Sequence, residues 1–248
     1  MTGAAMTGAA MTGAGMSAAG STVVATTATT ATPAGLLAVE WDVAGLFESV
    51  LALGVVLVAS FLLGAVNPAS IVAKVLGHDL AHSGSGNPGA TNAGRVLGVR
   101  WGVVVGLLDV LKGYLPVVVV QAVMGTVPAL CAGLAVVLGH IWSPFLRGHG
   151  GKGVATSLGA ILAVQPWFAL AIVVVFGVLV WRMRWVAGAS VSACLVLLLL
   201  GLGTWVGWVP GGTRDVGAWC VVLALVVIYR HRRNIELWVA ARRDSSTP

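Results

Sequence analysis

Long runs of apolar residues, separated by short polar segments, dominate the chain from about residue 43 onward. An α-helix rises about 1.5 Å per residue, so roughly 20 apolar residues cross a hydrocarbon layer of about 30 Å. The runs therefore predict seven membrane-spanning helices. Their expected ranges are 43–66, 101–124, 127–145, 154–165, 167–181, 186–209 and 216–229.

Two of these ranges are short for a membrane span. The range 154–165 is too short to cross alone, and the range 216–229 is marginal. Pro166 separates the fourth range from the fifth, and proline interrupts or kinks a helix. The two ranges could instead form one broken helix, which would give six spans.

The positions of the basic residues favour seven spans, because they then gather on one side of the membrane. Segments 67–100, 146–153, 182–185 and 230–248 share one face in this topology and hold 12 of the 14 Lys and Arg residues. Merging the fourth and fifth spans would divide these residues between two faces. Cytoplasmic loops are enriched in Lys and Arg, so the expected N-terminus is outside and the expected C-terminus is cytoplasmic.

Residues 1–35 differ from the rest of the chain. They begin with a five-residue quasi-repeat, MTGAA MTGAA MTGAG MSAAG, and the first charged residue of the chain is Glu40. Such a segment has little bulky apolar surface to bury and is expected to be disordered. It also lacks the basic start and dense apolar stretch of a signal peptide. We expect a low-complexity tail, 1–35, followed by one membrane domain, 36–248.

The composition agrees with an all-α, polytopic membrane protein. Hydrophobic residues make up 58% of the chain and charged residues only 9%, whereas a soluble domain is about 25% charged. The basic residues form no dense face with interleaved aromatics, which argues against nucleic-acid binding. The three cysteines lie singly in apolar runs, so neither a disulfide framework nor a zinc site is indicated.

The first polar segment, Ser83–Arg95, reads SGSGNPGATNAGR and falls on the predicted cytoplasmic face. Its glycines allow backbone N–H groups to converge on an anion, and its hydroxyl and amide side chains add hydrogen-bond donors. Arg95 can hold a phosphate through two parallel hydrogen bonds. The segment predicts an anion-binding loop, and a flexible turn between helices is the alternative.

The second polar segment, Arg147–Gly153, reads RGHGGKG and falls on the same face. Lys152 stands between two glycines at the start of the fourth span, where free N–H groups of a helix attract anions. The spacing is not that of a nucleotide-binding P-loop, because Gly153 follows Lys152 where Ser or Thr is required. The segment predicts a second anion site, and a positively charged membrane anchor is the alternative.

Two pairs of polar residues show helical spacing. In the third polar segment, Arg230–Glu236, His231 and Asn234 are three residues apart and can share one helix face. Inside the second span, Asp109 and Lys112 have the same spacing. Ionised groups are costly in lipid, so we expect these two to pair with each other or to face a polar interior.

Five segments, in order, resemble the motifs of the bacterial acyl-phosphate:glycerol-3-phosphate acyltransferases. The resemblance runs from about residue 67 to residue 236, and the first and fourth segments are its most specific parts. The segments are GxDLxxxGSGNPGATNxxR at Gly77–Arg95, DVLKG at Asp109–Gly113, GH at Gly139–His140, GGKGVAT at Gly150–Thr156 and HRxNI at His231–Ile235.

This resemblance implies a multi-pass enzyme of the bacterial cytoplasmic (inner) membrane, with seven helices and an active site on the cytoplasmic face. The implied reaction moves a fatty acyl group from acyl-phosphate to glycerol-3-phosphate. Its products are 1-acyl-glycerol-3-phosphate (lysophosphatidate) and phosphate, in the first acylation of phospholipid synthesis. No metal or other cofactor is expected. Apart from substrates and membrane lipid, the enzyme that makes acyl-phosphate is a candidate partner.

The loops and the resemblance together give the expected site. The Ser83–Asn92 loop would cradle the acyl-phosphate head group, the later motifs would hold glycerol-3-phosphate, and the acyl tail would extend between helices. The expected catalytic residues are Ser85, Arg95, Lys152 and His231. The expected substrate-binding residues are Gly84, Gly86, Asn87, Gly89, Thr91, Asn92, Gly151, Gly153, Ser190 and Asn234.

Three positions depart from the pattern of the family. Asn67 stands where the family often has Ile, and Ala81 replaces an Arg, so one cation of the first loop is missing. His82 is the candidate to compensate for that cation. In the segment RWVAGAS, Ala187 replaces one of two serines and leaves only Ser190.

Two alternatives stay open on the sequence alone. Ser85 could be an acyl-accepting nucleophile with His231 as its base, although an activated mixed anhydride requires no strong nucleophile. Glycine-rich polar loops would also suit an anion or phosphate transporter or channel. The polar residues, however, cluster on one face instead of along several spans. His231 is followed at the relevant spacing by Glu236, so the HxxxxD motif of acyltransferases with soluble donors is missing.

Overall fold

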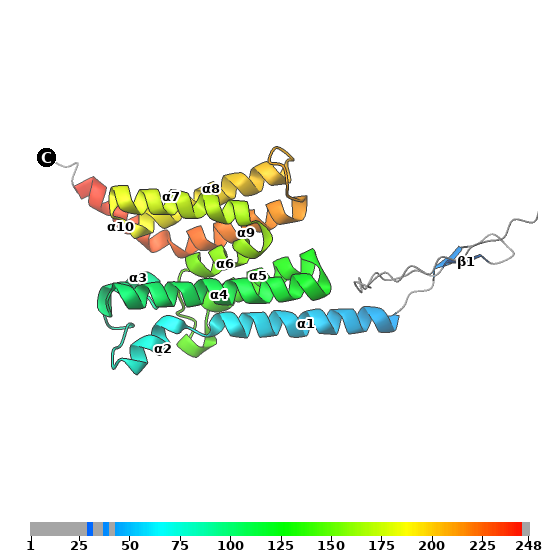
Figure 1. Cartoon of the computed structure of the whole chain (residues 1–248), viewed down its shortest axis with the longest axis horizontal. Coiled ribbons are helices and arrows are strands. Elements are labelled where there is room, and N and C mark those ends of the chain that lie inside the picture. The colour runs from blue at the N-terminus through cyan, green and yellow to red at the C-terminus, as the bar shows by residue number, and fades with distance from the viewer. Residues whose placement is uncertain (1–28, 32–36, 40–42, 245–248) are drawn as a thin grey trace, which may run out of the picture.

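The computed structural model describes residues 29–31, 37–39 and 43–244, whose regular elements are all helices apart from one short pair of strands (Figure 1). Strand β1, Thr29–Ala31, pairs antiparallel with β2, Leu37–Val39. The remainder of the predicted tail, 1–28 and 32–35, lies outside the described residues.

A helix forms at each of the seven places where a membrane span was predicted. Five helices in the described part of the chain are long and apolar enough to cross a membrane, whereas α6 has 11 residues and α9 has 17. The predicted polytopic helical bundle is confirmed at this level. The seven helices are α1 (Val43–Ala65), α4 (Val99–Met124), α5 (Thr126–Ile141), α6 (Val154–Val164), α7 (Pro166–Met183), α8 (Val186–Trp205) and α9 (Arg214–Arg230).

The fourth and fifth predicted ranges are separate helices, α6 and α7. Gln165 lies between them in a non-helical conformation, and Pro166 occupies the first position of α7, where its missing N–H costs nothing. The side-chain amide of Gln165 donates to the carbonyl of Gly211 over 3.0 Å. The α6–α7 junction therefore lies against the loop that joins α8 to α9.

Glycines allow several of the helix pairs to approach closely. A Cβ atom on Gly64 of α1 would collide with the carbonyl of Val136 in α5, and one on Gly139 of α5 would collide with the carbonyl of Phe61. Gly159 of α6 lies equally close to the backbone of α4. Small residues give tight helix contacts in lipid, where no hydrophobic force drives helices together.

Four short helices were not predicted from hydropathy, and they lie together at one end of the bundle in Figure 1. They are too short or too polar to give a hydropathy signal. These elements are α2 (Pro68–Val75), α3 (Ala90–Val96), the 3₁₀-helix η1 (Pro144–Leu146) and α10 (Arg232–Asp244). Because α2, α3, η1 and α10 flank the three polar segments, those segments share this end.

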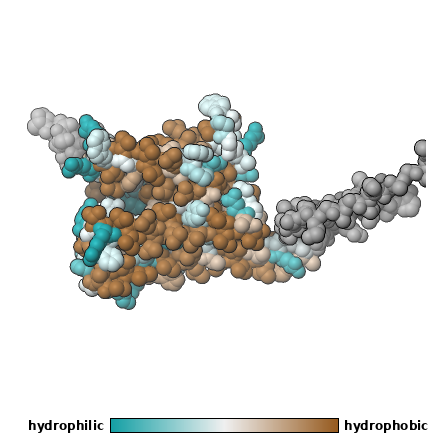
Figure 2. Space-filling view, viewed as in Figure 1, coloured by the Kyte–Doolittle hydropathy of each residue, from teal (hydrophilic) through white to brown (hydrophobic). Residues whose placement is uncertain are grey.

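The surface of the bundle is apolar around its middle. Figure 2 shows a hydrophobic band over the helices and hydrophilic residues toward the two ends. The interior is a packed cluster of small and branched side chains, including Val136, Val137, Ile161 and Leu223. This distribution is the one expected for helices that contact lipid along their length and water at their ends.

Candidate active site

The first polar segment forms a loop between α2 and α3 that depends on glycine at two positions. Gly84 and Gly86 have φ angles of +63° and +69°, in the left-handed region that L side chains rarely adopt. A Cβ atom on Gly84 would also collide with the side-chain oxygen of Asn92. Both glycines are therefore required for the loop to take this shape.

Asn92 holds the loop from inside. Its side chain is 1% exposed, its Oδ1 accepts from the N–H of Ser85 over 2.8 Å, and its Nδ2 donates to the carbonyl of Ser83 over 3.0 Å. The second Nδ2 hydrogen reaches the carbonyl of Leu80 over 3.3 Å. Both amide hydrogens are thus bonded to backbone carbonyls and are not available to a ligand. Asn92 therefore shapes the loop and does not bind substrate.

Asn67 ties the same loop to the end of α1, a role that sequence reasoning missed. Its Oδ1 accepts from the N–H of Ser70 and caps α2, while its Nδ2 donates to the carbonyl of Pro88 over 2.9 Å. An Asn before Pro is a common helix-capping arrangement. That signal could have marked Asn67 as structural rather than as a departure from the family pattern.

Several other side chains of the loop are open. Ser85, Thr91 and Arg95 are exposed and Asn87 is half-buried. None of these four side chains is hydrogen-bonded to another residue in the described part of the chain. They are therefore free to bind a ligand at this end of the bundle. Gly89 begins α3, and a Cβ there would lie 2.9 Å from the amide nitrogen of Asn87.

His82, the candidate for the missing cation, is paired with a neighbouring carboxylate. Its Nδ1 lies 2.6 Å from Oδ2 of Asp79, and both side chains are well exposed to solvent. The hydrogen bond to Asp79 raises the pKa of His82, and it lowers the pKa of Asp79. The charge of protonated His82 is therefore largely balanced by Asp79.

The second polar segment folds back onto the end of α5. The N–H groups of Gly150 and Gly151 donate to the carbonyls of Ile141 and His140 over 3.1 and 3.0 Å. A Cβ on Gly151 would collide with the imidazole ring of His140, so only glycine fits there. This folding carries Lys152 to the N-terminus of α6, where Gly153 has a φ of +84° and supplies no side-chain cap.

Lys152 connects the second segment to the third. Its Nζ donates to Oδ1 of Asn234 in α10 over 2.9 Å. Burial lowers the pKa of Lys152, and the nearby charges of Arg230 and Arg95 lower it further. The expected residues Arg95, Lys152 and Asn234 are thus brought together from three distant parts of the chain.

Arg230 joins this group although, in its segment, the sequence singled out only His231 and Asn234. Its Nη2 donates weakly, over 3.4 Å, to the carbonyls of Gly150 and Gly151. Its Nε is buried and has no hydrogen-bond partner among the described residues. Its position directly before His231 was the only signal in the sequence, and that signal is shared by ordinary anchors.

His231 lies at the end of α9 with its tautomer fixed. It is 1% exposed, and its Nδ1 lies 2.8 Å from the carbonyl oxygen of Val227. A carbonyl can only accept, so Nδ1 carries the hydrogen and Nε2 keeps its lone pair. Burial lowers the pKa of His231 more than the hydrogen bond to the Val227 carbonyl raises it, and the charges of Lys152 and Arg230 lower it further. The ring is therefore neutral at neutral pH.

Arg95, Lys152 and Arg230 have no carboxylate partner in the part of the chain that the structure describes. The ion pairs found among the described residues involve only Asp79 and Asp109, and neither pairs with Arg95, Lys152 or Arg230. Three cations held together without a counter-charge repel one another, and a bound anion relieves this repulsion. We call the group Arg95, Lys152, Arg230, His231 and Asn234 the cation cluster.

Ser190 is not joined to the cation cluster by any hydrogen bond. Its hydroxyl donates over 2.9 Å to the carbonyl of Val186, one turn earlier in α8. The start of α8 is nevertheless linked to α10, because the rings of Trp185 and Trp238 stack with centroids 5.7 Å apart. The role of Ser190 in binding stays a prediction.

The two charged residues expected inside the second span form an ion pair. Lys112 Nζ lies 2.9 Å from Oδ1 of Asp109, and both side chains are buried. Nδ1 of His140 lies 3.4 Å from the same oxygen. The predicted pairing is confirmed, and the pair has gained a third member from α5.

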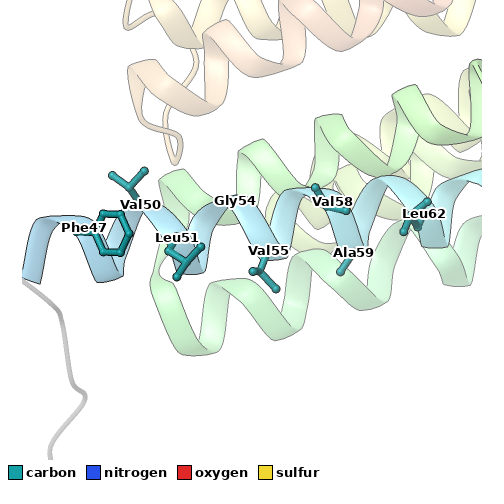
Figure 3. Close-up of a pocket in the computed structure, with 8 residues that line it drawn as sticks. All are labelled: Phe47, Val50, Leu51, Gly54, Val55, Val58, Ala59 and Leu62. Atoms are coloured by element: carbon teal, nitrogen blue, oxygen red, sulfur yellow. The ribbon is translucent and has the colours of Figure 1, made fainter.

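A shallow groove of about 650 Å³ follows α1 but offers no polar chemistry (Figure 3). All eight side chains that line it are apolar or glycine, and all belong to α1. They are Phe47, Val50, Leu51, Gly54, Val55, Val58, Ala59 and Leu62. Such a surface suits contact with lipid tails and cannot bind a phosphate.

Comparison with known proteins identifies close relatives of this chain. The sequence model of the glycerol-3-phosphate acyltransferase family matches residues 54–241. The glycerol-3-phosphate acyltransferase of Aquifex aeolicus is 39% identical over 186 residues, covering 74% of this chain and 93% of the relative. That of an Anaeromyxobacter species is 38% identical over 191 residues, covering 74% and 92%.

Two solved structures are also similar to this chain. Both are crystal structures of PlsY, described as an integral membrane glycerol 3-phosphate acyltransferase, and both are 36% identical to this chain. The glycerol 3-phosphate form has a TM-score of 0.70 and covers 77% of this chain and 94% of that one. The lysophosphatidic acid form has a TM-score of 0.68 and covers 77% and 93%.

Proposed function

Because this chain belongs to the glycerol-3-phosphate acyltransferase family, we propose that it transfers a fatty acyl group from acyl-phosphate to glycerol-3-phosphate. The chain is a multi-pass membrane acyltransferase, and the transporter alternative finds no support among its relatives. The products of the proposed reaction are lysophosphatidate and phosphate. The relatives support the acceptor directly, since one PlsY structure is a glycerol 3-phosphate form.

The cation cluster is the observation that carries this proposal. Lys152 Nζ lies 2.9 Å from Oδ1 of Asn234 and is close enough to Arg95 and Arg230 to feel their charges, and no carboxylate among residues 43–244 pairs with it. The uncapped N-terminus of α6 adds free N–H groups beside Lys152. A phosphate dianion matches this combination of cations and N–H donors.

The two phosphates of the substrates have separate places in this proposal. The open donors of the first loop, Ser85, Asn87 and Thr91, cradle the acyl-phosphate head group. Lys152 and Asn234 hold the phosphate end of glycerol-3-phosphate, with Ser190 as a further candidate. Arg95 lies between the two phosphate sites. It belongs to α3, beside the first loop, and its charge also lowers the pKa of Lys152 in the second.

His231 is suited to receive the acceptor hydroxyl. Its Nδ1–H is engaged by the carbonyl of Val227, so the lone pair of Nε2 is available for a hydroxyl group. Burial and the neighbouring cations keep the ring neutral, which is the form that can accept. In this role His231 orients the glycerol oxygen toward the acyl carbon and promotes its attack.

The proposed reaction is a direct transfer. The hydroxyl oxygen of glycerol-3-phosphate bonds to the acyl carbon, the bond from that carbon to the phosphate oxygen breaks, and the hydroxyl proton passes by way of Nε2 of His231 to the departing phosphate. The donor is a mixed anhydride and is already activated, so positioning supplies much of the rate. Such fixing of two reactants can be worth about 7–11 kcal/mol. Arg95 and the loop N–H groups stabilise the charge on the leaving phosphate.

We propose that this site faces the cytoplasm. In the proposed topology all seven helices cross the membrane in turn, with the N-terminus outside and the C-terminus inside, and the basic loops lie at the end that carries α2, α3 and α10. The excess of Lys and Arg at that end supports its cytoplasmic orientation in the bacterial inner membrane. The enzyme that makes acyl-phosphate would approach from this side.

Purified protein in detergent, supplied with acyl-phosphate and glycerol-3-phosphate, tests the proposed function. We expect equal amounts of lysophosphatidate and phosphate, and no product when acyl-CoA replaces acyl-phosphate. The absence of lysophosphatidate under these conditions would contradict the proposal.

Rapid mixing with acyl-phosphate alone separates direct transfer from the covalent route through Ser85. Direct transfer predicts no phosphate release before glycerol-3-phosphate is added. A burst of phosphate equal to the enzyme concentration would instead establish an acyl-enzyme.

A further inference from the structure

A buried cluster of three ionisable residues lies directly beneath the site and is not used by the proposed mechanism. Asp109 and Lys112 come from α4 and His140 comes from α5, and their side chains are 2%, 7% and 4% exposed. Asp109 Oδ1 lies 2.9 Å from Lys112 Nζ and 3.4 Å from His140 Nδ1. Charged residues are expensive in this environment, so the cluster calls for an explanation.

One arm of the cluster reaches the first loop. Lys112 Nζ also donates over 2.7 Å to the carbonyl of Val66, at the break between α1 and α2. This carbonyl has no helical partner, because the N–H of Ser70 is taken by the side chain of Asn67. Asn67 in turn donates to the carbonyl of Pro88 in the first loop. Two adjacent residues thus connect the Lys112 ammonium group to the proposed acyl-phosphate site.

The other arm reaches the second loop. The carbonyl of His140 accepts from the N–H of Gly151, and the imidazole ring packs so closely on Gly151 that no Cβ would fit. Gly151 directly precedes Lys152, the central residue of the cation cluster. The position of His140 therefore fixes the backbone of Gly151 and, with it, the position of Lys152.

We propose that Asp109, Lys112 and His140 are positioning residues that fix the spacing between the two anion-binding loops. The Asp109 carboxylate forms an ion pair with Lys112 on one side and lies against the His140 ring on the other. Neither Asp109 Oδ1 nor His140 Nδ1 has a hydrogen-bond partner among the described residues, so the two arms meet at Asp109 through charge and packing. This inference rests on the proposed function, in which each loop holds one substrate phosphate. A displacement of about 1 Å between reacting groups can cost roughly 100-fold in rate.

A double substitution separates positioning from simple structural support. Lys112→Met alone leaves the Asp109 carboxylate buried without its cation, so it should lower the thermal unfolding temperature and kcat together. The double variant Asp109→Asn/Lys112→Met removes both buried charges and should regain most of the unfolding temperature. Its kcat should nevertheless stay more than roughly 10-fold below wild type, with both KM values changed by less than about threefold. Full recovery of kcat together with stability would overturn the inference.

A second variant tests the first arm without touching buried charge. Asn67→Ser keeps a helix-capping oxygen for Ser70 but removes the donor to Pro88. We expect a lower kcat at an unfolding temperature within about 2 °C of wild type, and an unchanged kcat would overturn the inference even if the double variant failed to fold. Thr204→Val serves as control, because Thr204 is buried and donates only to Leu200 within α8. It should change stability without changing kcat.

The failure of the inference can be distinguished from the failure of the proposed function. A wild-type protein that makes no lysophosphatidate would refute the function. Calorimetric binding of glycerol-3-phosphate would then still report on the second loop. A wild-type protein that is active, beside double and Asn67→Ser variants that are stable and equally active, would refute the positioning role alone.

Discussion

The Nζ of Lys152 donates to the Oδ1 of Asn234 over 2.9 Å, although 82 positions separate the two residues along the chain. This contact joins the loop before α6 to the helix after α9, and so it closes the site at one end of the bundle. Lys152 has three ammonium hydrogens, and the contact to Asn234 uses only one of them. The remaining donors and the positive charge are available to a substrate phosphate.

Loss of the Lys152 ammonium group should nearly abolish transfer. We expect Lys152→Ala to lower kcat/KM by about 100-fold or more, because removing one donor from a charge-stabilising site typically costs this much. Steady-state kinetics with both substrates measures the loss. Arg182→Ala is the matched control, since Arg182 is an exposed basic residue in the last turn of α7 and makes no contact with the cation cluster. Equal losses in the two variants would refute the assignment of Lys152.

His231 should set the acid side of the pH profile. Burial, together with Lys152 and Arg230, lowers the pKa of His231 below its ordinary value of 6.5. Protonation as the pH falls through that lowered pKa removes the Nε2 acceptor, so kcat/KM should be full at neutral pH and lost in acid. The substrate phosphate also titrates, near pH 6. The pH profile of His231→Gln shows the effect of the phosphate alone, because this variant has no imidazole to titrate. If the His231→Gln profile retained the whole acid limb of wild type, His231 would not be the titrating group.

Lys152 should set the alkaline side of the same profile. Its pKa is lowered from 10.5, first by burial and then by the charges of Arg230 and Arg95. As the pH rises through this lowered pKa the ammonium group becomes neutral, so kcat/KM should fall at a pH below 10.5. Lys152→Arg keeps a positive charge and should remove the alkaline limb while lowering the maximum rate. An alkaline limb at the same pH in both proteins would show that another group is responsible.

The amide of Asn92 should be needed for the shape of the first loop. Asn92→Ala leaves the N–H of Ser85 and the carbonyls of Ser83 and Leu80 without their partner. Each buried unpaired group costs about 1–3 kcal/mol, so we expect lower stability and a KM for acyl-phosphate raised at least severalfold. Gly84→Ala should act similarly, because its φ of +63° and the nearby Asn92 oxygen exclude a Cβ. Thermal unfolding and initial-rate kinetics measure both effects, and a normal KM in both variants would contradict the loop assignment.

Hydropathy predicted the long helices of the bundle but not the short helices at its end. The long apolar helices begin and end close to their predicted residues because lipid-facing surfaces require continuous apolar runs. Helices α2, α3 and α10 gave no such signal, since tertiary contacts at the end of the bundle stabilise them. The most distinct example is α2, which exists because Asn67 caps it and Pro68 begins it.

The candidate site was predictable in its membership more than in its roles. Glycines and cations in the loops marked Gly84, Lys152 and His231, because anion binding favours these residue types. The roles of Asn92 and Arg230 depend on which backbone groups lie near them after folding. Asn92 satisfies three backbone groups inside one loop, and Arg230 reaches carbonyls about 80 residues away. No local pattern contains that information.

The stack of Trp185 on Trp238 should position α10 and, through it, Asn234. The two rings are nearly parallel, at 12°, with centroids 5.7 Å apart, and Gly188 provides the space for the Trp185 ring. An aromatic pair contributes about 0.5–1.5 kcal/mol. We therefore expect Trp238→Ala to raise the KM for glycerol-3-phosphate by about 2- to 10-fold with little change in kcat. Trp238→Phe, which keeps a ring in the stack, should recover most of this loss.

Near-ultraviolet circular dichroism provides a readout of the stack that is independent of turnover. The coupled signal of the two indoles should disappear in Trp238→Ala and in Trp185→Ala alike. Trp208→Ala is the control, since Trp208 is 85% exposed in the loop between α8 and α9, at the other end of the bundle. That variant should keep both the coupled signal and the wild-type KM. A Trp238→Ala protein that loses the coupled signal but binds glycerol-3-phosphate normally would show that α10 is held in place by its other contacts, above all by Lys152 and Asn234.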